Sequence, residues 1–338
     1  MLRRAFLNSV AAAPLIPFEP SVSFERDVLE HMSSASVPGV VVGKVEAEGP
    51  GWVKALGFAD NASKRPMTNA TLFQVASLTK QVIAYAAFAL RQQGKLDLDR
   101  TLVSYVDDLT DPLARTVTIR QVLSHSSGFP NWRFEAGQAL KPQLKPGTKF
   151  QYSGEGYFYL QRILEAVSGK GICEVVEDLV FRPLGMTASS FIVRPKCKEC
   201  LALPHNSRGE LRANWDRAPL ALHAMAQHKG QSITNWKYAD YAAAVKEAGV
   251  PVLPNMMLPN GESGDECLGL CQVSGQGDSE SGDPQRADSN PRPTWLGTWL
   301  GRGAGGDARL SLAVGRQPRL QAHRVCRAAA WRGFVCLY

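Results

Sequence analysis

Hydrophobic residues follow two different spacings along the first half of the chain. From Val37 to Gly57, a β-branched run, a Gly/Pro break and a second apolar run predict a hairpin of two strands. After Ser77 the spacing becomes helical and stops at Gly94, with apolar positions at Val82, Ile83, Ala86, Ala87 and Leu90. The many alanines of this predicted helix indicate that most of its surface is buried.

Two more helices are predicted downstream. The stretch Thr118–Pro130 predicts a short helix that closes at Gly128 and Pro130. The stretch Tyr157–Lys170 predicts an amphipathic helix with one apolar face and a stop at Gly169. Strands first and helices in the middle indicate an α+β fold.

The last quarter of the chain differs from the rest in composition. From Gly261 to Tyr338 there is no Lys, Ile or Met, whereas nine Arg and four of the seven Cys lie there. Gly, Pro and Ser are abundant, and no helical or strand periodicity persists. Such a composition is typical of a linker or a low-complexity tail.

Charge and hydropathy exclude several classes of protein. The chain has 338 residues and a formal net charge of +7, but its Lys and Arg are scattered. We therefore expect a solvated surface and no nucleic-acid partner. No apolar run approaches the roughly 20 residues needed to cross a bilayer, so no membrane span is expected.

The cysteines do not form a recognisable metal site. An odd number of seven argues against a pure disulfide framework. Cys197 and Cys200 form a lone CxxC, and neither a second CxxC nor a spaced pair of His follows it. We expect a local disulfide or two free thiols there, and no metal.

Residues 1–22 resemble a twin-arginine export signal. Arg3 and Arg4 precede Phe6, Leu7 and a short Ala-rich apolar segment. We expect export to the periplasm or the extracellular space; a frayed basic terminus is the alternative.

Ser77 and Lys80 form an S-x-x-K motif at the start of the predicted helix. Residues three apart share a helix face, so the amine is expected beside the hydroxyl. A buried lysine amine can take a proton from a serine, and a helix N-terminus supplies N–H groups for an oxyanion. The spacing therefore suits nucleophilic acyl transfer. The alternative is that Ser77 and Lys80 are solvated surface residues at the start of a helix and have no catalytic role.

Tyr152 lies in a turn-rich stretch just before the predicted helix at Tyr157. A tyrosine hydroxyl near the nucleophile can shuttle a proton to the leaving group. A packed, half-buried aromatic is the alternative for this residue. His125, in "SHSSG", raises the question of a Ser-His-Asp triad.

Four stretches occur in one order along the chain: "TLFQVASLTKQVIAYAAFALRQQGKLDLDRTLVSYV", "TIRQVLSHSSGF", "YSGEGYFYLQRILEAVSGK" and "FRPLGMTASSF". Together they resemble the serine β-lactamase and penicillin-binding-protein-like family, in its branch of β-lactamase-related hydrolases and esterases. The resemblance covers residues 24–260. It implies an antiparallel sheet flanked by helices plus a helical subdomain, with the active site between them.

The resemblance also implies roles for individual residues. Ser77 would be the acyl-accepting nucleophile, Lys80 its base partner and Tyr152 the proton shuttle of the second motif. The His125 segment would be a loop-forming helix end. A small molecule or a peptide would be the substrate, and no metal or organic cofactor would be needed.

The chain departs from the family pattern in two places. The second motif usually reads Tyr-x-Asn, but Gly154 stands at the Asn position and supplies no side-chain hydrogen bond. The third motif, which lines the site near the C-terminus, is missing from residues 261–338. The first departure favours a wider or different substrate than a β-lactam, and the second predicts a domain that is incomplete after residue 260.

A shift of reading frame would explain the second departure. Allowed codons can be chosen for two stretches of residues 261–338 and read one base late. In the first stretch isoleucine and a helical pattern return, and the second gives a Trp-Gly-Asp-Asn run where the third motif belongs. We therefore expect residues 261–338 to be an out-of-frame or disordered tail. A chain with this tail lacks strands that close the sheet, and it would fold poorly or be weakly active.

Two functions from different classes remain open. The first is a serine hydrolase that forms an acyl-enzyme with an ester, an amide or a β-lactam, as an esterase, a D-aminopeptidase, a carboxypeptidase or a β-lactamase would. The second is a non-catalytic family member that binds a cell-wall peptide or a protein partner.

A new reading of the coding DNA across Asn260 and Gly261 is expected to reveal one extra or one missing base. The corrected frame should then encode the third motif. An unchanged DNA sequence would make the tail genuine and would favour an inactive or ligand-binding protein.

Overall fold

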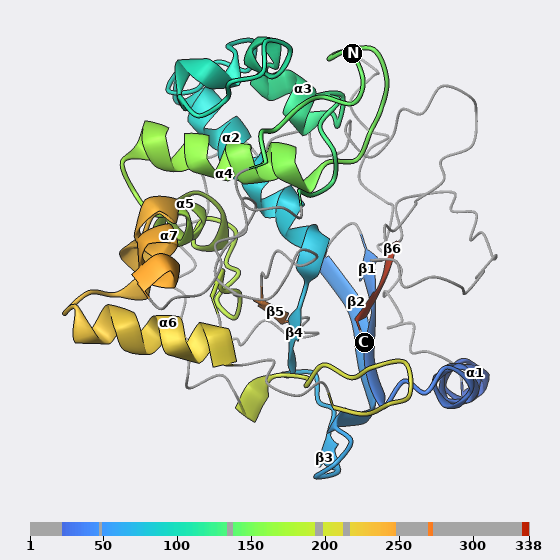
Figure 1. Cartoon of the computed structure of the whole chain (residues 1–338). Coiled ribbons are helices and arrows are strands. Elements are labelled where there is room, and N and C mark those ends of the chain that lie inside the picture. The colour runs from blue at the N-terminus through green and yellow to red at the C-terminus, as the bar shows by residue number, and fades with distance from the viewer. Residues whose placement is uncertain are drawn as a thin grey trace, which may run out of the picture.

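The computed structural model describes residues 22–46, 49–133, 138–192, 199–211, 217–247, 270–272 and 333–337. Seven α-helices lie in these ranges: α1 Val22–Ser34, α2 Thr79–Gln92, α3 Ile119–Leu123, α4 Gly154–Ser168, α5 Ile172–Val176, α6 Arg217–His228 and α7 Tyr238–Glu247. The strands are β1 Gly39–Glu46, β2 Gly49–Asp60, β3 Arg65–Pro66, β4 Leu72–Gln74, β5 Leu270–Gln272 and β6 Gly333–Leu337. The predicted α+β class is confirmed (Figure 1).

Short helical turns connect these elements. Three 3₁₀ turns, η1 to η3, span Ala76–Leu78, Leu102–Ser104 and Ala114–Thr116, and a fourth, η6, spans Ile233–Asn235. Glu177–Phe181 forms a π-helical turn, η4, that directly continues α5.

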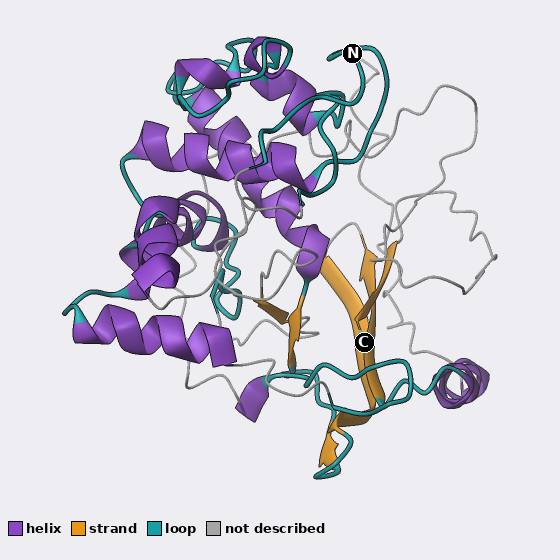
Figure 2. Cartoon of the chain, in the orientation of Figure 1, coloured by secondary structure: helices purple, strands orange, loops and turns teal. Residues whose placement is uncertain are grey.

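The strands form an antiparallel sheet in the order β3-β2-β1-β6, and β4 pairs separately with β5 (Figure 2). The predicted hairpin is confirmed, because β1 pairs with β2 from Gly39 opposite Gly57 to Glu46 opposite Gly49. Side chains alternate between the two faces of a strand. On one face of the sheet Val40 and Val42 pack with residues of α1; on the other, Val41 packs with Phe73 of β4.

Both β5 and β6 belong to the segment that we expect to be out of frame. The structure pairs β5 with β4 and β6 with β1. The rest of residues 261–338 lies outside the described residues, as do residues 1–21 with the predicted export signal. The predictions for these two segments therefore remain predictions.

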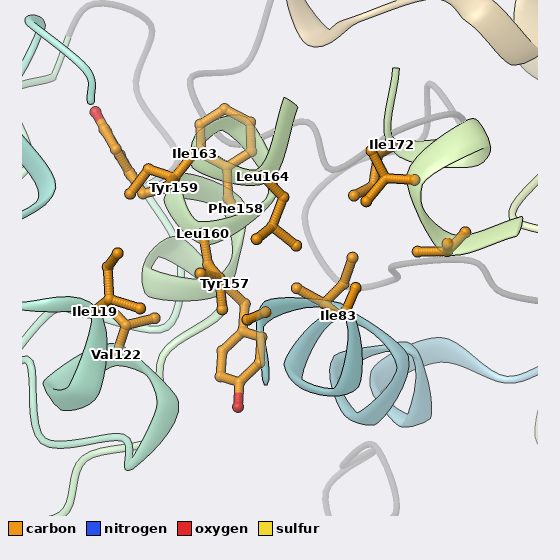
Figure 3. Packing of buried hydrophobic residues seen from close by; sticks show 14 of the residues in the cluster. Ile83, Ile119, Val122, Tyr157, Phe158, Tyr159, Leu160, Ile163, Leu164 and Ile172 are labelled. Atoms are coloured by element: carbon orange, nitrogen blue, oxygen red, sulfur yellow. The ribbon is translucent and has the colours of Figure 1, made fainter. Parts of the chain in front are cut away.

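The helices α2, α3, α4 and α5 share one large buried core (Figure 3). The apolar face predicted for α4 is confirmed, since Tyr157, Leu160 and Ile163 are buried in this core. Helix α4 begins at Gly154, earlier than the apolar spacing indicates, because the Ser153 hydroxyl accepts a hydrogen bond from the Gly156 N–H and caps the first turn. It ends at Gly169, whose φ of +74° stops the helix.

Helix α3 is shorter than predicted. A capping box of Thr118 and Gln121 starts it, but it ends at Leu123 rather than near Gly128. His125 has a φ of +52°, which a right-handed helix does not accommodate, and the chain turns there.

No helix in the described residues is long and apolar enough to cross a membrane. No group of three or more His, Cys, Asp or Glu that could hold a metal ion occurs among the same residues. Cys200 is an exposed free thiol, and its expected partner Cys197 lies outside the described residues.

Glu165 of α4 fixes two neighbouring helices. Glu165 is 4% exposed, and its carboxylate accepts hydrogen bonds from the backbone N–H of Ile172, at the start of α5, and of Tyr238, at the start of α7. A carboxylate at a helix N-terminus is favoured by the helix dipole. Burial nevertheless raises the pKa of Glu165 to about 7.

This raised pKa predicts a pH-dependent stability. Between its ordinary value of 4.5 and about 7, the folded protein holds a proton that the unfolded chain releases. The free energy of unfolding should therefore fall by roughly 2 kcal/mol as the pH rises from about 5 to about 8. Urea unfolding at both pH values should detect this loss in the wild type and not in Glu165→Gln.

Glu30→Gln, on the exposed side of α1, is the matched control for this experiment and should keep the wild-type pH dependence. An equal loss in Glu165→Gln and the wild type would show that the buried carboxyl does not contribute.

Candidate active site

Ser77 lies in the η1 turn between β4 and α2. In Figure 1 the N-terminal end of α2 lies next to the strands, and the helix then packs against α4. Ala76 precedes Ser77 with a φ of +41°, an uncommon conformation for a residue with a Cβ. Backbone strain of this kind is held in place by surrounding structure and is frequent at functional sites.

The two other residues predicted for the site both contact the hydroxyl of Ser77. Lys80, in the first turn of α2, donates a hydrogen bond from Nζ to Ser77 Oγ over 3.0 Å. Tyr152, in the segment before α4, donates from its hydroxyl to the same Oγ over 2.7 Å. The structure therefore brings all three predicted residues together at one atom.

Three aromatic rings surround the Lys80 amine. The distances from Nζ to the ring centroids are 5.0 Å for Tyr152, 5.9 Å for Trp132 and 5.9 Å for Tyr157. The lysine is 5% exposed, so these rings replace water around the amine. Ring faces attract a cation, and together they hold the amine in place beside Ser77.

Tyr157 differs chemically from Tyr152. Its hydroxyl donates to the Leu123 carbonyl over 3.3 Å, and burial raises the pKa of its phenol above the ordinary value, with Tyr152 adding to the effect. Tyr157 therefore stays a neutral phenol that packs against the site. Its hydrogen bond goes to the main chain, whereas that of Tyr152 goes to Ser77 Oγ.

Gly154 occupies a place that has no room for a side chain. A Cβ built there would lie 2.3 Å from the ring of Trp132, well inside van der Waals contact. The Gly154 N–H donates to Asn131 Oδ1 over 2.9 Å. Trp132 thus fills the space in which an Asn side chain at position 154 would start, so the absence of a side chain at Gly154 goes together with the presence of this ring.

An ion pair anchors the loop that carries Trp132. Arg133 Nη2 lies 2.9 Å from Glu155 Oε2, and both side chains are buried. The Arg133 backbone N–H and Nε also donate to Glu155 Oε1, over 2.8 and 3.0 Å. A bidentate pair of this kind fixes orientation as well as distance, so the loop is fastened to the start of α4.

His125 lies beside Tyr152 and does not form a Ser-His-Asp triad in the described structure. Its Nδ1 accepts a hydrogen bond from the Ser153 N–H over 3.1 Å. Its ring stacks on Tyr152, with centroids 4.5 Å apart. This position, just after α3, is consistent with the loop-forming helix end that the resemblance implies.

Sequence reasoning missed Trp132 and Tyr157 as neighbours of Lys80, and it missed the contact of His125 with Tyr152. Tyr157 carried a signal for burial only, as a member of the apolar face of α4. The segment Phe129–Arg133 has no helical or strand periodicity, so its sequence does not predict a contact between Trp132 and Lys80.

The chain matches the family model described as Beta-lactamase over residues 24–265. It therefore belongs to this family, and the resemblance read from the motifs is confirmed. A solved class C beta-lactamase has the same fold, with a TM-score of 0.51 and 26% sequence identity over 55% of this chain and 54% of that one.

Several relatives carry other names. The chain is 29% identical over 170 residues to Esterase EstB of Burkholderia gladioli, covering 41% of this chain and 43% of the relative. It is 29% identical over 201 residues to Lovastatin esterase of Penicillium rubens, covering 47% and 50%. It is 26% identical over 201 residues to Penicillin-binding protein 4 of Amycolatopsis lactamdurans, covering 54% and 52%. The matches span about half the length of these relatives.

The close packing of Gly154 against Trp132 yields a testable prediction. Gly154→Ala should lower the free energy of unfolding by about 1–3 kcal/mol, the usual result of overpacking a buried position. In a Trp132→Ala background the same substitution should have almost no additional effect, because the ring is gone. Chemical unfolding of both single variants and the double variant measures this coupling.

Equal losses from Gly154→Ala in the two backgrounds would contradict the contact. The single variant Trp132→Ala is the necessary control, since it has a cavity of its own and should be destabilised by about 3–5 kcal/mol.

Proposed function

We propose that this chain is a serine hydrolase that cleaves esters through an acyl-enzyme on Ser77. The observation that carries the proposal is the convergence of Lys80 Nζ and Tyr152 OH on Ser77 Oγ, at 3.0 and 2.7 Å. A serine hydroxyl becomes an effective nucleophile only when a neighbouring group accepts its proton. Two candidate groups lie within hydrogen-bond distance of the hydroxyl.

The protons can move within this cluster. The protonated Lys80 amine first releases its proton to water. As the free base it then takes the proton of Ser77 as Oγ forms a bond to the ester carbonyl carbon. Tyr152 then gives its proton to the departing alkoxide as the carbon–oxygen bond breaks, and regains one from Lys80. In deacylation the same groups take a proton from water and return one to Ser77 Oγ.

The charge on the carbonyl oxygen needs a partner in the transition state. The backbone N–H of Ser77, at the positive end of the α2 dipole, is suited to this role. In relatives the third motif supplies a second donor, and losing one such donor usually lowers the rate by about 10²–10³. A chain with the corrected frame would therefore be the more active form.

Trp132 and Gly154 support an ester rather than a β-lactam as the acyl donor. An Asn side chain at position 154 would offer an amide to an acylamino group of the substrate. Here carbon atoms of the tryptophan ring take the space where that side chain would start. Simple esters do not need the missing amide, whereas β-lactams and acylated peptides lose a hydrogen-bond partner.

The proposal predicts covalent labelling at one residue. A fluorophosphonate probe should add to Ser77 and to no other serine, as peptide mass spectrometry would show. Labelling should disappear in Ser77→Ala, and Tyr152→Phe should slow p-nitrophenyl ester hydrolysis by about 10²–10⁴, the usual contribution of a proton-transfer group. Ser104→Ala, an exposed serine of η2, is the control and should behave as the wild type.

The alternative, a non-catalytic binding protein, makes the opposite prediction. Such a protein would retain a β-lactam or a cell-wall peptide in equilibrium binding without any mass increase at Ser77.

A further inference from the structure

His125 contacts the segment around Tyr152 at three points. The Gln151 N–H donates to the His125 carbonyl oxygen over 2.7 Å, and the Ser153 N–H donates to His125 Nδ1 over 3.1 Å. The imidazole stacks on the Tyr152 ring, with centroids 4.5 Å apart and an interplanar angle of 27°. One residue therefore holds the backbone on both sides of Tyr152 and its ring as well.

The backbone of His125 is itself held in a strained conformation. Its φ of +52° is uncommon for a residue with a Cβ and costs on the order of 1 kcal/mol. The His125 N–H donates to the Val122 carbonyl over 3.0 Å, and the Ser126 N–H donates to the Gln121 carbonyl over 2.8 Å. These bonds impose the turn that directs the carbonyl and the ring of His125 toward the same segment.

The contact with Ser153 requires an unprotonated Nδ1, because that nitrogen accepts a hydrogen bond. Burial lowers the pKa of His125 to about 4, and the charge of Lys80 on α2 acts in the same direction. The other titratable groups against the ring are the phenols of Tyr152 and of Tyr157 on α4. Above about pH 5 the imidazole is therefore neutral, with its proton on Nε2.

We infer that His125 is a positioning residue for the reaction, which holds the Tyr152 hydroxyl on Ser77 Oγ. This inference rests on the proposed function. The Tyr152–Ser77 hydrogen bond of 2.7 Å spans 75 positions of sequence, so its length depends on what holds the Tyr152 segment. His125 acts only through Tyr152 and has no direct contact with the reacting oxygen.

Two substitutions separate the contacts of His125. Asn at position 125 keeps a side-chain acceptor near the place of Nδ1 and tolerates positive φ, but it lacks the ring. Phe keeps a ring that can stack and lacks the acceptor. We expect His125→Asn to keep kcat within about threefold of the wild type and His125→Phe to lower kcat by about 10- to 100-fold, with little change in KM.

A double-mutant cycle distinguishes positioning from a purely structural role. In a Tyr152→Phe background, His125→Phe should cause no further loss of kcat, because the hydroxyl that it positions is already absent. A structural role would lower kcat by the same factor in both backgrounds. Ser124→Ala is the matched control, since it alters the same turn without touching Tyr152, and thermal unfolding of every variant identifies any that fails to fold.

A measurement that does not depend on catalysis tests the position of Tyr152 independently of the proposed function. Protein labelled with 3-fluorotyrosine is observed by ¹⁹F NMR, and the Tyr152 signal is assigned from its disappearance in Tyr152→Phe. We expect this signal to move and broaden in His125→Phe and to stay unchanged in Ser124→Ala. If Ser77 fails to react with fluorophosphonate while the Tyr152 signal moves as expected, the proposed function is wrong and the positioning contact stands. An unchanged Tyr152 signal in folded His125→Phe, or equal kcat losses in the two backgrounds, would overturn the inference.

Discussion

The geometry of the site depends on the hydrogen bonds that hold the segment Gln151–Glu155 against the segment His125–Arg133. The N–H groups of Gln151, Ser153, Gly154 and Glu155 all donate to acceptors in the second segment. Unpaired backbone groups are costly when buried, so this register is strongly preferred over its neighbours. Because Tyr152 lies in the middle of the bound segment, its hydroxyl has a fixed position relative to Ser77.

The same constraint explains the lack of a side chain at position 154. The Arg133–Glu155 pair and the bond from Gly154 to Asn131 bring Trp132 against the start of α4. The ring then completes the aromatic surroundings of Lys80. Gly154, which departs from the Tyr-x-Asn pattern, is thus part of a consistent local arrangement in which the Trp132 ring occupies the adjoining space.

Membership of the beta-lactamase family limits the chemistry but leaves the substrate open, since relatives of similar identity are named esterases and a penicillin-binding protein. One fold can accept different acyl donors because the nucleophile lies on the scaffold while the groups around it vary. In this chain the varied groups include Trp132 and Gly154, close to Lys80.

The sequence alone predicted the β1–β2 hairpin, the apolar cores of α2, α3 and α4, and the three residues that meet at Ser77 Oγ. Apolar spacing predicted the hairpin and the helices after Ser77 and before Gly169. The S-x-x-K spacing predicted that Lys80 lies beside Ser77. Both predictions succeed because they depend only on residues that are close along the chain. The sequence did not determine where α3 ends. The left-handed turn at His125 is made by local bonds to Val122 and Gln121 and is supported by long-range bonds from Gln151 and Ser153, which the local pattern does not contain. Only the tertiary structure decided that Trp132 covers Gly154 and that His125 holds Tyr152. These contacts join segments that no periodicity relates, and their geometry is set by packing and by the need to pair buried backbone groups.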